Sequence, residues 1–251
     1  QNLYEDSVGW YKTVLHIDKP HDYYTALRFE GVYMDSTIYV NKTKVFEWKY
    51  GYSTFEVPVD EYLQEGDNEI LVKVVHLAPN SRWYSGAGIY RPVYLIRKNR
   101  QRFLPDGIYI HSERDKSGYV SVITAETDTT ACNENARIRA WITDASGDTV
   151  TEAVTALPEE EIIISNQTAK EWSLTAPNLY YLQIELFDVL CNKVYDRDCI
   201  RFGYRTLTFT TDRGFFLNDE YVKIQGAALH HDLGSLGSAV NKTAIRRQLK
   251  I

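Results

Sequence analysis

The stretch YTALRFEGVYMDSTIYVNKTKVF, residues 24–46, is the part of the chain that decides the class of fold. Its first residues place Thr25, Leu27 and Phe29 on one face of an extended chain. Alternation with a period of two is typical of a β-strand that is buried on one side. The stretch predicts three strands and one tight turn, at residues 24–30, 37–40, 41–42 (the turn) and 43–46.

The same pattern continues on both sides of this stretch. Short strands at intervals of about 8–12 residues, separated by turn residues, are typical of an all-β sandwich. Further strands of a first sandwich are predicted at 55–59, 69–76 and 93–96. After a charged connector, a second set has the size of an immunoglobulin-like sandwich, with strands predicted at 108–111, 119–124, 136–142, 162–165, 170–174, 182–187 and 194–202.

The last 46 residues have a different texture. They predict a β-hairpin at 215–224 over the turn Asn218–Asp219, a loop rich in small residues, and the start of a helix within 238–251. So short a segment cannot bury a core of its own, and we interpret it as the beginning of a third domain. The predicted domains are residues 1–98, 99–205 and 206–251.

Composition and charge exclude several classes of protein. The net charge is −6, and no basic run could displace counterions from a polyanion, so we expect no nucleic-acid partner. No apolar stretch approaches the ~18 residues that a membrane span requires. The chain has 19 Tyr and only one Met, as expected for pleated sheets. Cys132, Cys191 and Cys199 show no metal-ligand spacing, so no metal site is predicted, and we expect at most one disulfide.

Three segments, at residues 27–41, 80–94 and 201–232, together resemble the front part of glycoside hydrolase family 2. The resemblance runs in the right order along the whole chain. It implies a jelly-roll sugar-binding β-sandwich, an immunoglobulin-like β-sandwich and a short, truncated start of a (β/α)₈ barrel. The chain departs from the family at both hairpin turns, Asn41–Lys42 and Asn218–Asp219, where Asn-Gly is usual, and at Ala227–Ala228, where the family usually has Val-Asn.

The resemblance also implies the chemistry of the full-length protein. We expect a retaining, exo-acting hydrolase of terminal β-D-galactosides that uses no cofactor, with a homo-oligomer left open. Such a barrel needs about 200–250 residues, so the two catalytic glutamates lie beyond this sequence, and these residues alone are expected to be inactive. The alternatives are a β-glucuronidase, a β-mannosidase, or a carbohydrate-binding module without catalysis. The chain starts on polar sequence at Gln1, which leaves the compartment open, with the periplasm or secretion favoured over the cytoplasm.

Four residues are predicted to bind the sugar. The resemblance places His230 at the end of the first barrel strand, where it hydrogen-bonds sugar hydroxyls, and His231 beside it. Arg82 lies in a glycine-rich loop, and its guanidinium offers a rigid fork of donors that suits vicinal hydroxyls. Asp35, with Tyr33, lies on the corresponding first loop. We identify no catalytic residue in these 251 positions.

Overall fold

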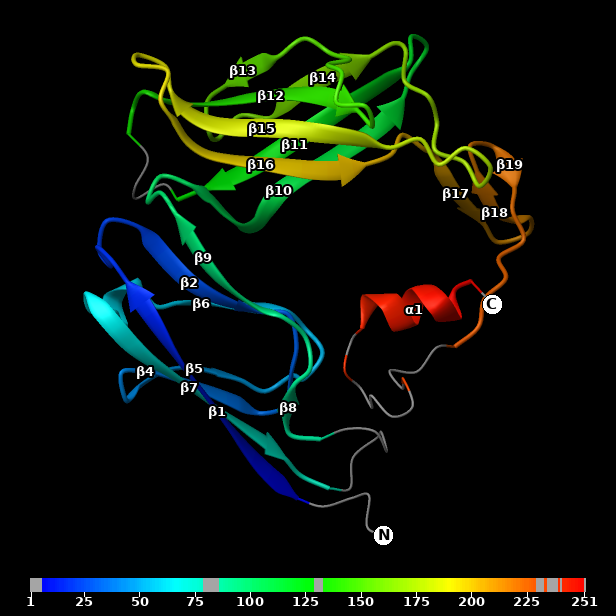
Figure 1. The fold of residues 1–251 in the computed structure, drawn as a ribbon. Helices are drawn as coiled ribbons and strands as arrows, with labels where there is room; N and C mark the ends of the chain where they lie inside the picture. The colour runs from blue at the N-terminus through cyan, green and yellow to red at the C-terminus, as the bar shows by residue number, and fades with distance from the viewer. Residues whose placement is uncertain are drawn as a thin grey trace. The chain divides into compact units, whose positions relative to one another are not determined.

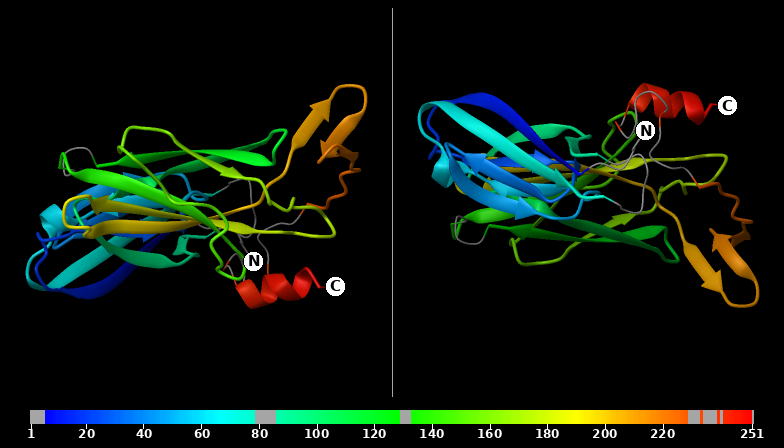
Figure 2. Two further views of the ribbon diagram at one scale, coloured as in Figure 1. Left: turned by 90° about the horizontal axis from the view of Figure 1, so that it is seen from above. Right: turned by 90° about the horizontal axis from the view of Figure 1, so that it is seen from below.

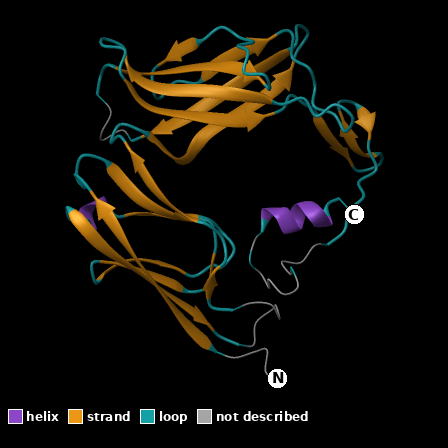
Figure 3. Ribbon diagram, viewed as in Figure 1, coloured by secondary structure: helices purple, strands orange, loops and turns teal. Residues whose placement is uncertain are grey.

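The computed structural model describes residues 6–78, 86–128, 133–228, 233, 239 and 241–250. Strands dominate these residues, as Figure 3 shows, and the predicted all-β class is confirmed. The chain forms two compact units. The first comprises residues 1–98 with 227–251, and the second comprises residues 99–226.

Two antiparallel sheets enclose the core of the first unit (Figure 1). One has the order β1 (Ser7–Ile17), β7 (Gly66–His76), β4 (Ser36–Val40), β5 (Thr43–Trp48). The other has the order β6 (Phe55–Pro58), β2 (Tyr24–Phe29), β9 (Val93–Lys98). A short pair, β3 (Val32–Tyr33) with β8 (Gly88–Ile89), and the 3₁₀ turn η1 (Asp60–Tyr62) complete the described part. The core side chains come from both sheets, among them Leu27, Phe29, Ile38, Val57, Ile70 and Val72.

The predicted turn between β4 and β5 is confirmed. Asn41 and Lys42 have φ angles of 49° and 70°, as a two-residue type I′ hairpin turn requires. The Asn41 amide nitrogen donates to Asn68 Oδ1 at 2.8 Å, and Asn41 Oδ1 accepts from the Glu69 backbone N–H at 3.0 Å. Because Asn tolerates the left-handed region and its side chain satisfies neighbouring groups, the turn forms without glycine.

In this unit one strand was not predicted and one prediction needs correction. The 11-residue strand β1 was missed, because it carries apolar side chains on both faces and most of it is exposed, which hides the period of two. The alternation at 24–30 predicts one buried face, yet Tyr24 and Ala26 on the other face are buried as well. Side chains of the neighbouring strand β6 contribute to this second face, where the Tyr24 hydroxyl donates to the Glu56 carboxylate at 2.8 Å.

The second unit is another two-sheet sandwich. One sheet has the order β10 (Phe103–Arg114), β11 (Tyr119–Thr127), β14 (Ile162–Asn166). The other has the order β13 (Val154–Ala156), β12 (Ala136–Asp144), β15 (Tyr180–Asp188), β16 (Val194–Phe202). β12 and β15 pair over nine residues each, and their inward side chains, including Ile138, Ala140, Leu182 and Ile184, are fully buried.

The strand predicted at 170–174 is wrong, and the short strand β13 was missed. Trp172 makes only an isolated bridge to Pro177. Groups that belong to no strand ladder satisfy this segment: the Trp172 N–H donates to the Tyr204 carbonyl at 2.7 Å, and the Lys170 N–H donates to the side-chain hydroxyl of Tyr180 at 2.9 Å. A backbone N–H that already has such a partner does not require a hydrogen bond to a neighbouring strand.

A hairpin follows β16 within the second unit (Figure 2). It consists of β17 (Leu207–Thr210), β18 (Gly214–Leu217) and β19 (Glu220–Tyr221). The predicted turn is confirmed, with φ angles of 51° at Asn218 and 67° at Asp219. The Asn218 amide donates to the Trp172 carbonyl at 3.0 Å and its Oδ1 accepts from the Thr206 N–H at 2.9 Å. The assignment of residues 206–251 to a barrel stays a prediction.

One α-helix, α1 (Lys242–Gln248), lies in the described part of the chain. The Asn241 side chain caps its first turn by accepting from the N–H groups of Thr243 and Ala244 at 3.0 and 3.1 Å. A helix was predicted within 238–251, and the described one is shorter. In the described residues, no helix has the length and apolar character that crossing a bilayer would take.

Candidate carbohydrate-binding site

Asp35 lies on the connection between β3 and β4, at one end of the first unit. It is exposed and has a φ of 45°, and its N–H donates to the Lys49 carbonyl at 3.2 Å. The neighbouring Met34 carbonyl accepts from the Val75 N–H at 3.0 Å. These two bonds hold the loop from both sides, so the predicted sugar-binding carboxylate stands on a fixed backbone.

The residues that flank the segment with Arg82 lie beside this loop. β7 ends at His76, whose ring centroid is 6.0 Å from that of Tyr33. β8 resumes with Gly88, which pairs with Tyr33 in the β3–β8 ladder. Arg82 itself lies outside the described residues, so its role stays a prediction.

A cluster of four tyrosines supports the Asp35 loop. The rings of Tyr33 and Tyr52 meet edge to face with centroids 5.1 Å apart, and Tyr52 meets Tyr50 at 5.8 Å and Tyr90 at 6.5 Å in the same manner. Such edge-to-face pairs stabilise by roughly 0.5–1.5 kcal/mol each beyond their buried area. Tyr33 is only 8% exposed, so it supports the loop and offers no free face for a sugar.

Tyr90 ties three segments of this end together. Its hydroxyl donates to the Gly51 carbonyl at 2.8 Å, and its backbone N–H donates to the Gly31 carbonyl at 3.2 Å. The Arg91 guanidinium lies 5.1 Å from the Tyr90 ring centroid. Burial raises the pKa of the Tyr90 hydroxyl, with smaller contributions from neighbouring tyrosines, so it remains a donor.

Of the four residues predicted to bind the sugar, the structure describes Asp35 alone, and its role too stays a prediction. Asp35 is exposed at this end, whereas Arg82, His230 and His231 lie outside the described residues and remain predictions. Sequence reasoning missed Tyr50, Tyr52 and Tyr90. The sequence Tyr50-Gly51-Tyr52, between two predicted strands, could have pointed to these residues. A glycine between two aromatic residues in a connection indicates a tight, packed loop.

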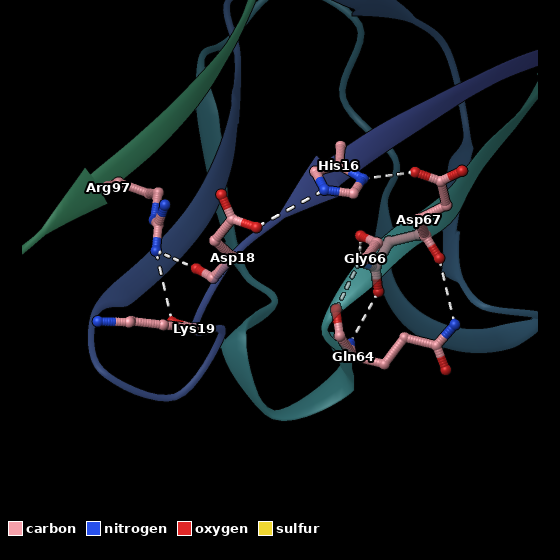
Figure 4. Close-up of polar contacts among 8 residues, drawn as sticks. His16, Asp18, Lys19, Gln64, Gly66, Asp67 and Arg97 are labelled. Carbon is pink, nitrogen blue, oxygen red and sulfur yellow. Dashed lines mark hydrogen bonds and ion pairs between the residues drawn. The ribbon is translucent and has the colours of Figure 1, made fainter.

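A second polar cluster lies at the opposite end of the same sheet, as the β1–β7 register shows: Ser7 pairs with His76, and Ile17 with Gly66. In Figure 4, His16 stands between two carboxylates, with Nδ1 2.8 Å from Asp67 Oδ1 and Nε2 3.6 Å from Asp18 Oδ1. Arg97 donates to the Asp18 carbonyl at 2.7 Å. The side chains of His16 and both carboxylates are largely exposed to solvent, so the cluster links strand ends and does not form an enclosed acid–base site.

We expect the Asp67→Asn substitution to lower the pKa of His16. The hydrogen bond to Asp67 is the largest cause that raises this pKa above 6.5. Because folding raises the pKa, the contact stabilises the fold when the pH is below the unfolded value, and this contribution is lost as pH rises through the folded value. Asp67→Asn should therefore destabilise more at pH 5.5 than at pH 8.5.

The measurement is the NMR titration of the His16 imidazole, with urea unfolding at both pH values. Asp35→Asn is the matched control, since it removes one exposed carboxylate at the other end of the sheet. Asp35→Asn should leave the pKa of His16 unchanged. If Asp67→Asn also leaves it unchanged, the pair of His16 with Asp67 does not form in solution.

Charged groups in the second unit hold the β17–β19 hairpin. Arg114 donates to Glu171 at 3.1 Å and forms an ion pair with Asp219 in the hairpin turn. The Tyr119 hydroxyl donates to the same Glu171 carboxylate at 2.7 Å, and burial together with this bond raises the pKa of Tyr119. Every member of this cluster has a partner within the protein, so we assign it a structural role.

The described residues contain no candidate metal site and no disulfide bond. They contain no group of three or more His, Cys, Asp or Glu side chains that could hold a metal ion. Cys191 and Cys199 are free and exposed, and Cys132 lies outside the described residues.

Comparison with known proteins identifies the class of both units. The sequence profile of the glycosyl hydrolase family 2 sugar-binding domain matches residues 3–99. A second profile, glycosyl hydrolases family 2, matches residues 106–205. The chain belongs to glycoside hydrolase family 2.

Individual relatives agree with this assignment. A β-galactosidase of Bacteroides ovatus is 34% identical over 97% of this chain and 30% of its own length. A β-glucuronidase of Bacteroides fragilis is 23% identical over 94% of this chain and 37% of its own length. The structure of a family 2 member from Bacteroides cellulosilyticus superposes with a TM-score of 0.87 at 29% identity, covering 97% of this chain and 35% of that one. The chain thus spans about a third of the length of these relatives.

Proposed function

We propose that this chain is the sugar-binding part of a retaining, exo-acting β-galactosidase. The similarity to the Bacteroides ovatus β-galactosidase along 97% of the chain is the observation that carries the proposal. The exposed Asp35 on a doubly held loop supports it, because a carboxylate accepts hydrogen bonds from sugar hydroxyls. In this proposal Arg82, His230 and His231 supply further hydrogen bonds to the same sugar.

The residues of this chain would bind and orient the sugar, and the bond would be broken elsewhere in the full-length protein. Retaining hydrolysis requires two carboxyl groups about 5–5.5 Å apart, one as acid/base and one as nucleophile. We nominate no such pair here. A β-glucuronidase is the second candidate, because a relative that carries this name matches 94% of the chain. We have no observation that favours a β-mannosidase or a binding module without catalysis.

The proposal predicts that the full-length protein hydrolyses 4-nitrophenyl β-D-galactoside, whereas residues 1–251 alone show no turnover. Without an acid/base and a nucleophile in place, neither step of the double displacement is accelerated. The measurement is release of 4-nitrophenol from the galactoside and the glucuronide by both proteins. Arg82→Ala and Asp35→Ala in the full-length protein should each lower kcat/KM by about tenfold, as expected for a lost hydrogen bond that involves a charged group.

Two results would contradict the proposal. Preferred hydrolysis of the glucuronide would favour the second candidate. Turnover by residues 1–251 that disappears when one of their own carboxylates is replaced would place the chemistry within this chain.

A further inference from the structure

Tyr50 is an exposed aromatic residue on the loop that joins β5 to β6. It is 62% exposed, while its ring rests edge to face on Tyr52 with an interplanar angle of 65°. Removing a large aromatic ring from water is favourable. The neighbouring tyrosines leave most of the Tyr50 ring exposed, so a bound ligand could still cover it.

The loop that carries Tyr50 is held rigidly. The Gly51 carbonyl accepts the Tyr90 hydroxyl at 2.8 Å, and a Cβ at Gly51 would lie 2.3 Å from Cδ2 of Tyr33. On the far side of the loop, Trp48 Nε1 donates to Ser53 Oγ at 3.1 Å. Binding therefore costs little additional ordering of this backbone, which is the advantage of a preorganised site.

The loop is also joined to the candidate sugar site. The Asp35 N–H donates to the carbonyl of Lys49, the residue before Tyr50. An aromatic face and a carboxylate held on one backbone unit match the two surfaces of a pyranose, since the ring offers an apolar face of C–H groups and an edge of hydroxyls.

We propose that Tyr50 is a stacking platform for the leaving side of the β-glycoside, meaning the second sugar or the aryl group, and thereby selects substrates. The inference rests on the function proposed above. An exo-acting enzyme encloses the terminal sugar and leaves the rest of the glycoside towards solvent. A ring that is 62% exposed fits that outer group.

The first test compares substrates with and without a ring on the leaving side, using the full-length protein. Tyr50→Ala should lower the ratio of kcat/KM for 4-nitrophenyl β-galactoside to that for methyl β-galactoside by about three- to tenfold. Tyr50→Phe keeps the ring and should keep the ratio. The matched control is Tyr62→Ala, because Tyr62 is exposed and its carbonyl accepts from the Asn41 amide at the opposite end of β4; this variant should leave the ratio at its wild-type value.

Two results would overturn the inference: an unchanged ratio in Tyr50→Ala, whether or not kcat/KM falls equally for both substrates, or a Tyr50→Phe variant that behaves like Tyr50→Ala. If the wild-type protein prefers a glucuronide, the same aryl-to-methyl comparison applies to that sugar. A wrong assignment of the substrate can therefore be distinguished from a wrong assignment of the role of Tyr50.

A second test does not depend on turnover. Saturation-transfer NMR with lactose and residues 1–251 should show transfer to the protons of the glucose ring. We expect Tyr50→Ala to lose this transfer and Tyr50→Phe and Tyr62→Ala to retain it. Equal transfer in wild type and Tyr50→Ala, or none in the wild type, would show that Tyr50 is not a platform.

Discussion

Replacing Tyr204 by alanine is expected to destabilise the second unit by about 3–5 kcal/mol, the usual loss for a large aromatic residue in a core. Tyr204 is fully buried, and its ring packs against Tyr119, Tyr180 and Phe202 with centroids 4.9, 4.9 and 5.0 Å away. Truncation would leave a cavity among these three rings, which the rigid strands around it cannot close.

The loss is measured by urea unfolding, with amide exchange of β15 as the reporter for this unit. Tyr204→Phe should cost only about 1 kcal/mol, because it keeps the ring and removes the hydroxyl that accepts from the Asn166 amide at 3.5 Å. Tyr109→Ala in β10 is the control, since Tyr109 is 63% exposed. An equal loss in Tyr204→Ala and Tyr109→Ala would mean that the aromatic cluster does not support the sandwich.

The second large effect is expected in the first unit, where Asn68→Ala should destabilise by about 2–6 kcal/mol. Asn68 is fully buried, and its side chain makes four hydrogen bonds. Its Oδ1 accepts from the Asn41 amide and the Gln64 N–H, and its Nδ2 donates to the carbonyls of Gln64 and Gly66, each at 2.8–2.9 Å. At about 0.5–1.5 kcal/mol net for each bond, the sum gives the expected range.

Urea unfolding followed by amide exchange of β4 and β7 measures this loss. Glu65→Ala is the matched control, because Glu65 is an exposed residue three positions away in the same turn. We expect it to change the free energy of unfolding by less than about 0.5 kcal/mol. Comparable losses in the two variants would argue that water replaces the Asn68 contacts at no cost.

Much of the fold could be predicted because its signals are local. Strand β7 alternates between buried and partly exposed residues along most of its length, and such a pattern is written in consecutive side chains. The turn at Asn41–Lys42 depends on residues that tolerate a positive φ, which is again a property of two adjacent positions. The family assignment followed from segments in a specific order, so it too needed no coordinates.

Two of the errors share one cause, which is that partners distant in the sequence override local preference. β1 pairs with β7 over its whole length although it shows no clear alternation. Residues 170–174 look like a strand, yet the Trp172 N–H is satisfied by the Tyr204 carbonyl. A local pattern cannot report a hydrogen bond that a remote segment supplies.

The sequence by itself therefore determined the all-β class, most strands of both sandwiches, the hairpin turns and the family. Only the tertiary structure decided how the Asp35 loop is held, which tyrosines surround it, and that His16 pairs with Asp67, 51 positions away. The physical reason is the difference in range. Backbone preference and side-chain alternation act between neighbours along the chain, whereas sheet register and packing determine which distant side chains meet.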